Sequence, residues 1–199
     1  MQKILDDAVR EGRDLTSMGK TADYIPELGR VNKDYLGVCV FTKEGKRWQS
    51  GDSDVRFTIQ SISKVITLAV ALEKCGFEKV FARVGMEPSG DAFNSLIKLD
   101  LTSDHPFNPM INSGAIAVTN YLVSLVNFEE MLDFTKILCL DDKIVLDEKV
   151  YQSEMNHISR NKAIAYLLES KGILENSVEE TIDKKVKMCS LSVTAASLA

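Results

Sequence analysis

The sequence is poor in the residues from which metal sites and disulfide frameworks are built. Among 199 residues there are two histidines and four cysteines, and the cysteines lie far apart without a Cys-x-x-Cys pair. Zinc sites need such ligands at close spacing, and a chain of this length needs no covalent cross-links to fold. We therefore expect no zinc site, and free thiols in a reducing cytoplasm.

Long apolar runs and dense basic runs are also missing. The longest strongly apolar run, residues 65–72, is far shorter than the roughly 20 residues that span a bilayer. The first ten residues are charged and amphipathic, unlike a signal peptide. The formal net charge is −5. We expect neither membrane insertion nor secretion, and neither nucleic acid nor an anionic membrane as a main partner.

What is present is the composition of a folded globular chain, with 45% hydrophobic and 27% charged residues. Apolar residues recur at helical spacing up to about residue 16. A β-hairpin pattern follows over residues 36–51, and a third strand is expected over residues 55–60. Everything after Gln60 has a helical pattern. The sequence predicts an α+β fold, with a helix and about three antiparallel strands in residues 1–66 and a mostly helical part in residues 67–199.

The helical part contains two largely apolar helices. The first starts at Ser61 and ends before Gly76, and the second covers residues 112–126. Amphipathic helices are expected at residues 128–138, 148–154, 160–168 and 178–188. Three strands make a small sheet for this much chain, and residues 191–199 are apolar without a stop signal. We therefore expect the fold to continue beyond this chain.

A serine and a lysine lie three residues apart in Ser61-Ile-Ser-Lys64. A neutral lysine on the same helix face could take the serine proton. The bare pattern recurs at Ser17–Lys20, Ser95–Lys98 and Ser159–Lys162, but only Ser61 stands at a strand-to-helix junction, and only Lys64 lies inside the most apolar helix. The alternative is that Ser61 is an N-cap and that Lys64 extends to solvent.

Three further positions carry polar groups that could face a cleft. Asn112 precedes the second apolar helix, where capping by Asn112 or Asn108 and close packing at Gly114 are the alternative. Glu154 and Asn161 are seven residues apart and would share a face if one helix carried both. A carboxylate and an amide suit the ammonium and carboxylate of an amino acid, although a solvated helix face is the simpler interpretation.

Tyr24 precedes Ile25-Pro26, and it could equally be a packed aromatic residue in an ordered loop.

Several ordered segments of the chain together resemble the serine-dependent glutaminase family. They are Asp23-Tyr-Ile-Pro-Glu-Leu28, Phe57-Thr-Ile-Gln-Ser61-Ile-Ser-Lys64, Glu87-Pro-Ser-Gly-Asp-Ala-Phe-Asn-Ser95, Pro106-Phe-Asn-Pro-Met-Ile-Asn112-Ser-Gly-Ala115, and Ser153-Glu154 followed by Arg160-Asn161. The resemblance implies a β-lactamase/transpeptidase-like fold, hydrolysis of L-glutamine to L-glutamate and ammonia without a cofactor, and assembly as a homo-oligomer, either a dimer or a tetramer.

The resemblance also implies roles for single residues. Ser61 would be the nucleophile, and its backbone N–H would supply half of the oxyanion hole, while Lys64 would be the base. Glu154 would bind the substrate ammonium. The positions that would hold glutamine are Tyr24, Gln60, Ser61, Asn112, Glu154 and Asn161.

Two departures from the family pattern stand out. The family has a tyrosine four residues before its Cys-Ser, whereas Lys185 stands there ahead of Cys189-Ser190. The family's catalytic domain also continues past this point, with a further tyrosine and a Lys-Ser-Gly-type strand that provides the second oxyanion donor. A non-catalytic ligand-binding form is therefore the main alternative function. A serine hydrolase acting on β-lactams or peptides is a weaker one, which Glu154 and Asn161 argue against.

Overall fold

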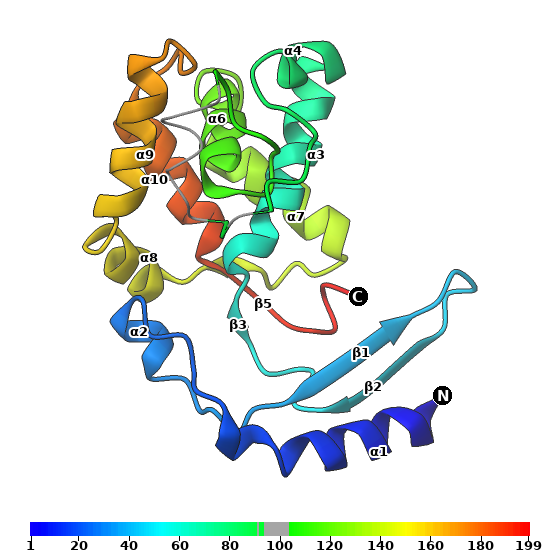
Figure 1. Cartoon of the computed structure of the whole chain (residues 1–199). Coiled ribbons are helices and arrows are strands. Elements are labelled where there is room, and N and C mark those ends of the chain that lie inside the picture. The colour runs from blue at the N-terminus through cyan, green and yellow to red at the C-terminus, as the bar shows by residue number, and fades with distance from the viewer. Residues whose placement is uncertain (91, 94–103) are drawn as a thin grey trace.

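The computed structural model describes residues 1–90, 92–93 and 104–199 (Figure 1). The helices and strands in chain order are α1 (Gln2–Arg13), the 3-10 turn η1 (Thr16–Met18), α2 (Pro26–Gly29), β1 (Gly37–Phe41), β2 (Arg47–Gly51), β3 (Phe57–Thr58), the 3-10 turn η2 (Gln60–Ile62), α3 (Ser63–Cys75), α4 (Phe77–Phe81), α6 (Asn112–Leu122), α7 (Phe128–Cys139), β4 (Val145–Leu146), α8 (Glu148–Met155), α9 (Ser159–Ser170), α10 (Val178–Cys189) and β5 (Leu191–Val193).

The N-terminal part is a helix lying along a two-stranded hairpin (Figure 1). Helix α1 is amphipathic and buries Leu5 and Val9. Strands β1 and β2 pair antiparallel, so that Val40 lies opposite Trp48. Gly45 in the connecting turn has a φ of 78°, a left-handed conformation that glycine adopts without strain. The hairpin predicted over residues 36–51 is thus formed.

The helical part is organised around α6, which is almost entirely buried. Helices α3, α9 and α10 pack against it, which explains why both α3 and α6 are apolar with almost no polar stripe. Fully buried side chains at the centre of this core include Ile116 and Leu122 of α6, Ile164 and Leu168 of α9, and Ile182 of α10. Helix α8 and the start of α3, which carry residues of the site described below, lie at the lower end of this bundle in Figure 1.

A second small sheet corrects the prediction of about three strands followed only by helices. Its order is β3-β5-β4, so β5 pairs antiparallel with a strand on each side. Thr58 lies opposite Ser192, and Ser192 also lies opposite Val145. The third predicted strand is shorter than expected and pairs with β5 instead of the hairpin. Strands of two or three residues are too short to give an alternating pattern, which is why the sequence did not reveal β4 and β5.

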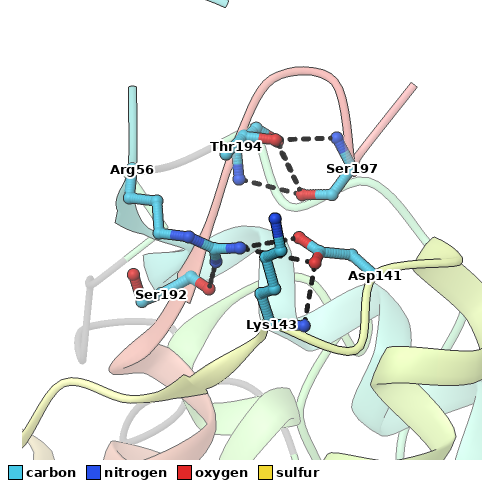
Figure 2. A network of polar contacts seen from close by, with 6 residues as sticks. All are labelled: Arg56, Asp141, Lys143, Ser192, Thr194 and Ser197. Atoms are coloured by element: carbon cyan, nitrogen blue, oxygen red, sulfur yellow. Dashed lines mark hydrogen bonds and ion pairs between the residues drawn. The ribbon is translucent and has the colours of Figure 1, made fainter. Parts of the chain in front are cut away.

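Arg56 holds the second sheet to the loop that precedes β4, as Figure 2 shows. Its guanidinium donates to the carbonyl of Ser192 at 2.8 Å and to the Asp141 carboxylate at 3.1 Å. The Asp141 carboxylate also accepts the backbone N–H of Lys143 at 2.9 Å. This contact set fixes the segment that leads into β3, and therefore the approach of the chain to Ser61.

The predicted helices agree with the observed ones to within a few residues. The helix expected from Ser61 starts at Ser63, because residues 60–62 form the 3-10 turn η2. The helix expected over residues 112–126 ends at Leu122. The division at residue 66 falls inside α3 and stays a prediction. None of the helices in the described part of the chain combines the length and apolar character that a membrane-spanning helix needs.

Gly114 allows α6 to pack directly against the preceding loop. A Cβ atom at this position would lie 1.9 Å from the carbonyl oxygen of Asn108. We expect Gly114→Ala to destabilise the fold by about 3 kcal/mol, because backbone has to move to relieve the overlap. Thermal unfolding followed by circular dichroism should show a lower midpoint than for Gly19→Ala, whose Cβ would meet nothing closer than 3.9 Å. Equal midpoints for the two variants would contradict the prediction.

Candidate active site

A cavity of about 280 Å³ gathers nearly all of the residues that the sequence singled out. Its walls come from η2, α8, α9 and α10, from the first residue of α6 and from the loop before α2. The predicted site residues that line it are Tyr24, Gln60, Ser61, Asn112, Glu154, Asn161 and Lys185. Two larger cavities, of about 500 and 790 Å³, lie beside the hairpin and beside β5 and contain none of them.

Ser61 lies on a tightly turned segment between β3 and α3. Gln60, the residue before it, has a φ of 48°, in the left-handed region that costs a non-glycine residue about 1 kcal/mol. The Gln60 side chain accepts from the Tyr24 hydroxyl at 2.8 Å and donates to Thr58 at 3.0 Å. The alternative that Ser61 caps α3 is wrong, because Ile62 occupies the N-cap position and no side chain caps the helix.

Lys64 is buried, so the alternative that it extends to solvent is wrong. It is 5% exposed, and its Nζ donates to the carbonyl of Met110 and to Oδ1 of Asn112, both at 2.8 Å. Burial lowers the pKa of Lys64 to about 8; the positive charge of Lys185 adds to this, and Cys189 opposes it. The neutral form of Lys64 is therefore far more populated near physiological pH than that of an ordinary lysine, although the ammonium form still predominates.

Asn112 connects Lys64 to the opposite wall of the cavity. While its Oδ1 accepts from Lys64, its Nδ2 donates to Oδ1 of Asn161 at 3.1 Å. Asn112 does not cap α6, whose N-cap is Ile111. Asn108 instead fixes the preceding loop, because its Oδ1 accepts from the backbone N–H groups of Met110 and Ile111. The close packing expected at Gly114 is confirmed.

Glu154 and Asn161 line the same cavity from two different helices, α8 and α9. The condition that one helix carries both residues is therefore not met. A solvated face is also wrong for Glu154, which is 6% exposed. Its Oε2 atom is buried without a hydrogen-bond partner. Burial raises the pKa of the Glu154 carboxyl, and the positive charge of Lys185 opposes this rise.

Tyr24 lies at the mouth of the cavity. Although it is 60% exposed, its hydroxyl reaches Gln60, and burial of that group together with the charge of Glu154 raises the pKa of Tyr24 to about 12. The hydroxyl therefore stays protonated and can donate a hydrogen bond at any ordinary pH. Sequence reasoning missed His157 and Ile158, which also line the cavity. They lie in the turn between α8 and α9, and no pattern in the sequence distinguishes them.

The Ser95–Lys98 pattern and part of the segment at 87–95 lie outside the described residues. Within the described ranges, no group of three or more side chains drawn from histidine, cysteine, aspartate or glutamate is placed to hold a metal ion.

All four cysteines are free thiols, and Cys189 is buried in the cavity wall.

Comparisons with known proteins point to one family. The family model described as Glutaminase matches residues 19–199. Glutaminase 2 of Clostridium perfringens is 44% identical over 203 residues, which cover all of this chain and 67% of that protein. A glutaminase of Alkaliphilus oremlandii is 42% identical over the same share of both chains.

Solved structures give the same result. A probable glutaminase of Bacillus subtilis superposes with a TM-score of 0.87 at 35% identity, covering all of this chain and 62% of that one. A protein called Mglu, in its L-glutamate binding form, superposes with a TM-score of 0.90 at 36% identity, covering all of this chain and 45% of that one. The chain thus spans about two thirds of its curated relatives and about half of the Mglu chain.

The fold expected from the resemblance is confirmed, because the structural neighbours share the β-lactamase-like architecture and the described part of this chain is rich in helices with small antiparallel sheets. The similarity extends over the whole chain and includes the segments that carry Ser61, Asn112 and Glu154. Sequence and structure thus agree that this chain belongs to the glutaminase family.

Proposed function

We propose that this chain carries the nucleophile, the base and the substrate pocket of a glutaminase, which hydrolyses L-glutamine to L-glutamate and ammonia. The observation that supports this most strongly is the environment of Lys64, a buried amine one helical turn from the exposed Ser61. A lysine side chain is seldom buried unless its charge is compensated or its proton is lost. In this cavity a neutral Lys64 has a use, because a serine hydroxyl requires a base to become a nucleophile.

The two hydrogen bonds of Lys64 leave its lone pair free. A neutral amine has two N–H groups, and these are taken by Met110 and Asn112. The lone pair can accept the Ser61 proton while Oγ of Ser61 bonds to the side-chain amide carbon of glutamine. Returning that proton to the amide nitrogen releases ammonia and leaves an acyl-enzyme, which water hydrolyses to glutamate and free Ser61. The backbone N–H of Ser61, at the start of a helical turn, is available as one oxyanion donor.

The substrate assignment is supported by the charges and amides of the cavity. The Glu154 carboxylate is a partner for the ammonium of an amino acid, and the amides of Asn112 and Asn161 offer both donors and acceptors. Tyr24 adds a hydroxyl at the mouth. The related protein Mglu has been crystallised in an L-glutamate binding form. L-glutamate is the product of the reaction proposed for this chain.

Release of ammonia and glutamate from L-glutamine across a range of pH tests the proposal. We expect equal amounts of the two products and a rate that rises with pH through an inflection near the pKa of Lys64, about 8. The sign follows because only neutral Lys64 accepts the proton, and the neutral form increases as pH rises. Ammonia without glutamate, or a rate that falls over this range, would contradict the assignment of Lys64 as base.

A binding protein for the same amino acid is the second candidate, favoured by the buried cation of Lys185 where the family has a tyrosine. Calorimetry that detects L-glutamine binding by a chain without turnover would identify it. Both candidates include a cytoplasmic location, which the free thiols support, and a homo-oligomer, which the family resemblance supports.

A further inference from the structure

Lys185 is a buried cation whose hydrogen-bonding capacity is mostly unused. It lies on α10, lines the cavity and is 7% exposed. Among the contacts of the described residues, the acceptor found for its Nζ is the sulfur of Cys189, at 3.7 Å. Sulfur is a weak acceptor, and an ammonium group has three N–H donors. At least two of these donors remain for a group that enters the cavity.

The neighbouring Lys184 shows what a satisfied buried lysine looks like on this helix. It is 8% exposed, and its Nζ donates to the backbone carbonyls of Leu122, Val123 and Val126, the first at 2.8 Å. Those carbonyls lie at and just beyond the end of α6, where backbone acceptors are unpaired within the helix. Lys184 is thus held by the fold, whereas Lys185 lines the cavity with a weak sulfur acceptor as the partner found for its Nζ among the described residues.

Glu154 is the counterpart of Lys185 in the same cavity. Its Oε2 is buried without a hydrogen-bond partner, as noted above. No ion pair within 4.0 Å joins Glu154 to Lys185, although both side chains are described and line the same cavity. Among the residues that the structure describes, neither Glu154 nor Lys185 therefore has a close partner of opposite charge. An incoming ligand with both a cation and an anion would supply both partners at once.

We propose that Lys185 is a specificity-determining residue that binds the α-carboxylate of an amino-acid ligand whose α-ammonium is bound by Glu154. The identity of that ligand as L-glutamine rests on the proposed function. A tyrosine at this position would offer one neutral donor, whereas the buried Lys185 ammonium can form a charge-assisted hydrogen bond with a carboxylate. This chain therefore discriminates strongly against analogues that lack the α-carboxylate.

Calorimetric binding of two ligands to matched variants tests this inference. The background is Ser61→Ala, which prevents turnover, and the ligands are L-glutamine and its α-carboxamide, which keeps the ammonium and the side chain but has no α-carboxylate. We expect Lys185→Met to weaken L-glutamine binding by about tenfold or more, the size of a hydrogen bond to a charged group. Binding of the α-carboxamide should change by less than about threefold, because that ligand never used the Lys185 charge.

Lys187→Met is the matched control. Lys187 lies on the same helix and its Nζ pairs with Asp183 at 2.8 Å, outside the cavity lining, so the substitution removes the same charge without touching the site. L-glutamine should bind to this variant as tightly as to the background. Circular dichroism on all variants checks that the helix content is the same.

Equal losses for both ligands in Lys185→Met would overturn the inference, because they would indicate a general packing role. No loss for either ligand, or no L-glutamine binding by the background, would also overturn it. The proposed function is judged separately, by ammonia release from the chain with Ser61 intact. Turnover without a carboxylate-selective effect of Lys185 would contradict only the inference, and the selective effect without turnover would contradict only the hydrolytic function.

Discussion

Replacing Ser61 with alanine is expected to reduce ammonia release from L-glutamine by about 10⁶-fold, the typical loss when a serine hydrolase loses its nucleophile. The substitution removes the only atom that we assign to bond formation and leaves the rest of the cavity unchanged. Because Ser61 is exposed and does not cap α3, the variant should unfold at the same temperature as the original chain. Coupled measurement of ammonia and glutamate checks the activity.

Ser17→Ala is the matched control for Ser61→Ala. Ser17 begins a second Ser-x-x-Lys pattern with Lys20, but it lies in η1 outside the cavity lining. This variant should retain full activity. If Ser61→Ala kept glutamine turnover within tenfold of the original chain, Ser61 would not be the nucleophile, and the mechanism proposed above would be wrong.

Replacing Lys64 with methionine is expected to reduce the rate by about 10²–10⁴-fold, the usual contribution of a general base. Methionine has a similar length, so it fills the space that the buried Lys64 side chain occupies, but it cannot accept the Ser61 proton. The carbonyl of Met110 and Oδ1 of Asn112 lose their donor, which should cost about 1–3 kcal/mol of stability. Turnover assays and thermal unfolding measure the two effects separately.

Two controls show whether the effect of Lys64→Met is chemical. Lys20→Met removes a lysine from an exposed position and should change neither the rate nor the stability. Ligand binding by Lys64→Met should persist, because Glu154 and Lys185 are intact. If Lys64→Met binds L-glutamine normally and also hydrolyses it at the original rate, Lys64 has only a structural role.

The parts of the site that depend on local sequence could be predicted without a structure. The change from an alternating pattern to an apolar helix placed Ser61 at a strand-to-helix junction. The lack of other charges around Lys64 singled it out, but burial and extension to solvent both stayed open until the structure showed it buried. Long helices were also predictable, since α6, α7 and α10 each repeat their apolar positions over three turns.

The parts that depend on tertiary packing could not be predicted from the residues alone. Glu154 and Asn161 are separated by a turn that carries no glycine or proline, so nothing local showed that they belong to two helices. Lys64 forms a hydrogen bond with Asn112, and Asn112 forms one with Asn161. Each of these bonds joins residues more than forty positions apart in the sequence. Such contacts depend on how α6 meets α3 and α9, which no local pattern records.

The position of β5 in the middle of its sheet has a consequence for how the site is made. The residues just before Ser61 are held by the end of the described chain, because Phe57 pairs with Val193 and the backbone N–H of Ile59 donates to Leu191 at 2.9 Å. Pairings across so long a loop carry a large entropic cost and form late in folding. During synthesis on the ribosome, the hairpin and α3 therefore emerge long before the turn at Ser61 is fixed. The nascent chain acquires an ordered nucleophile position only after residues 191–193 have left the exit tunnel.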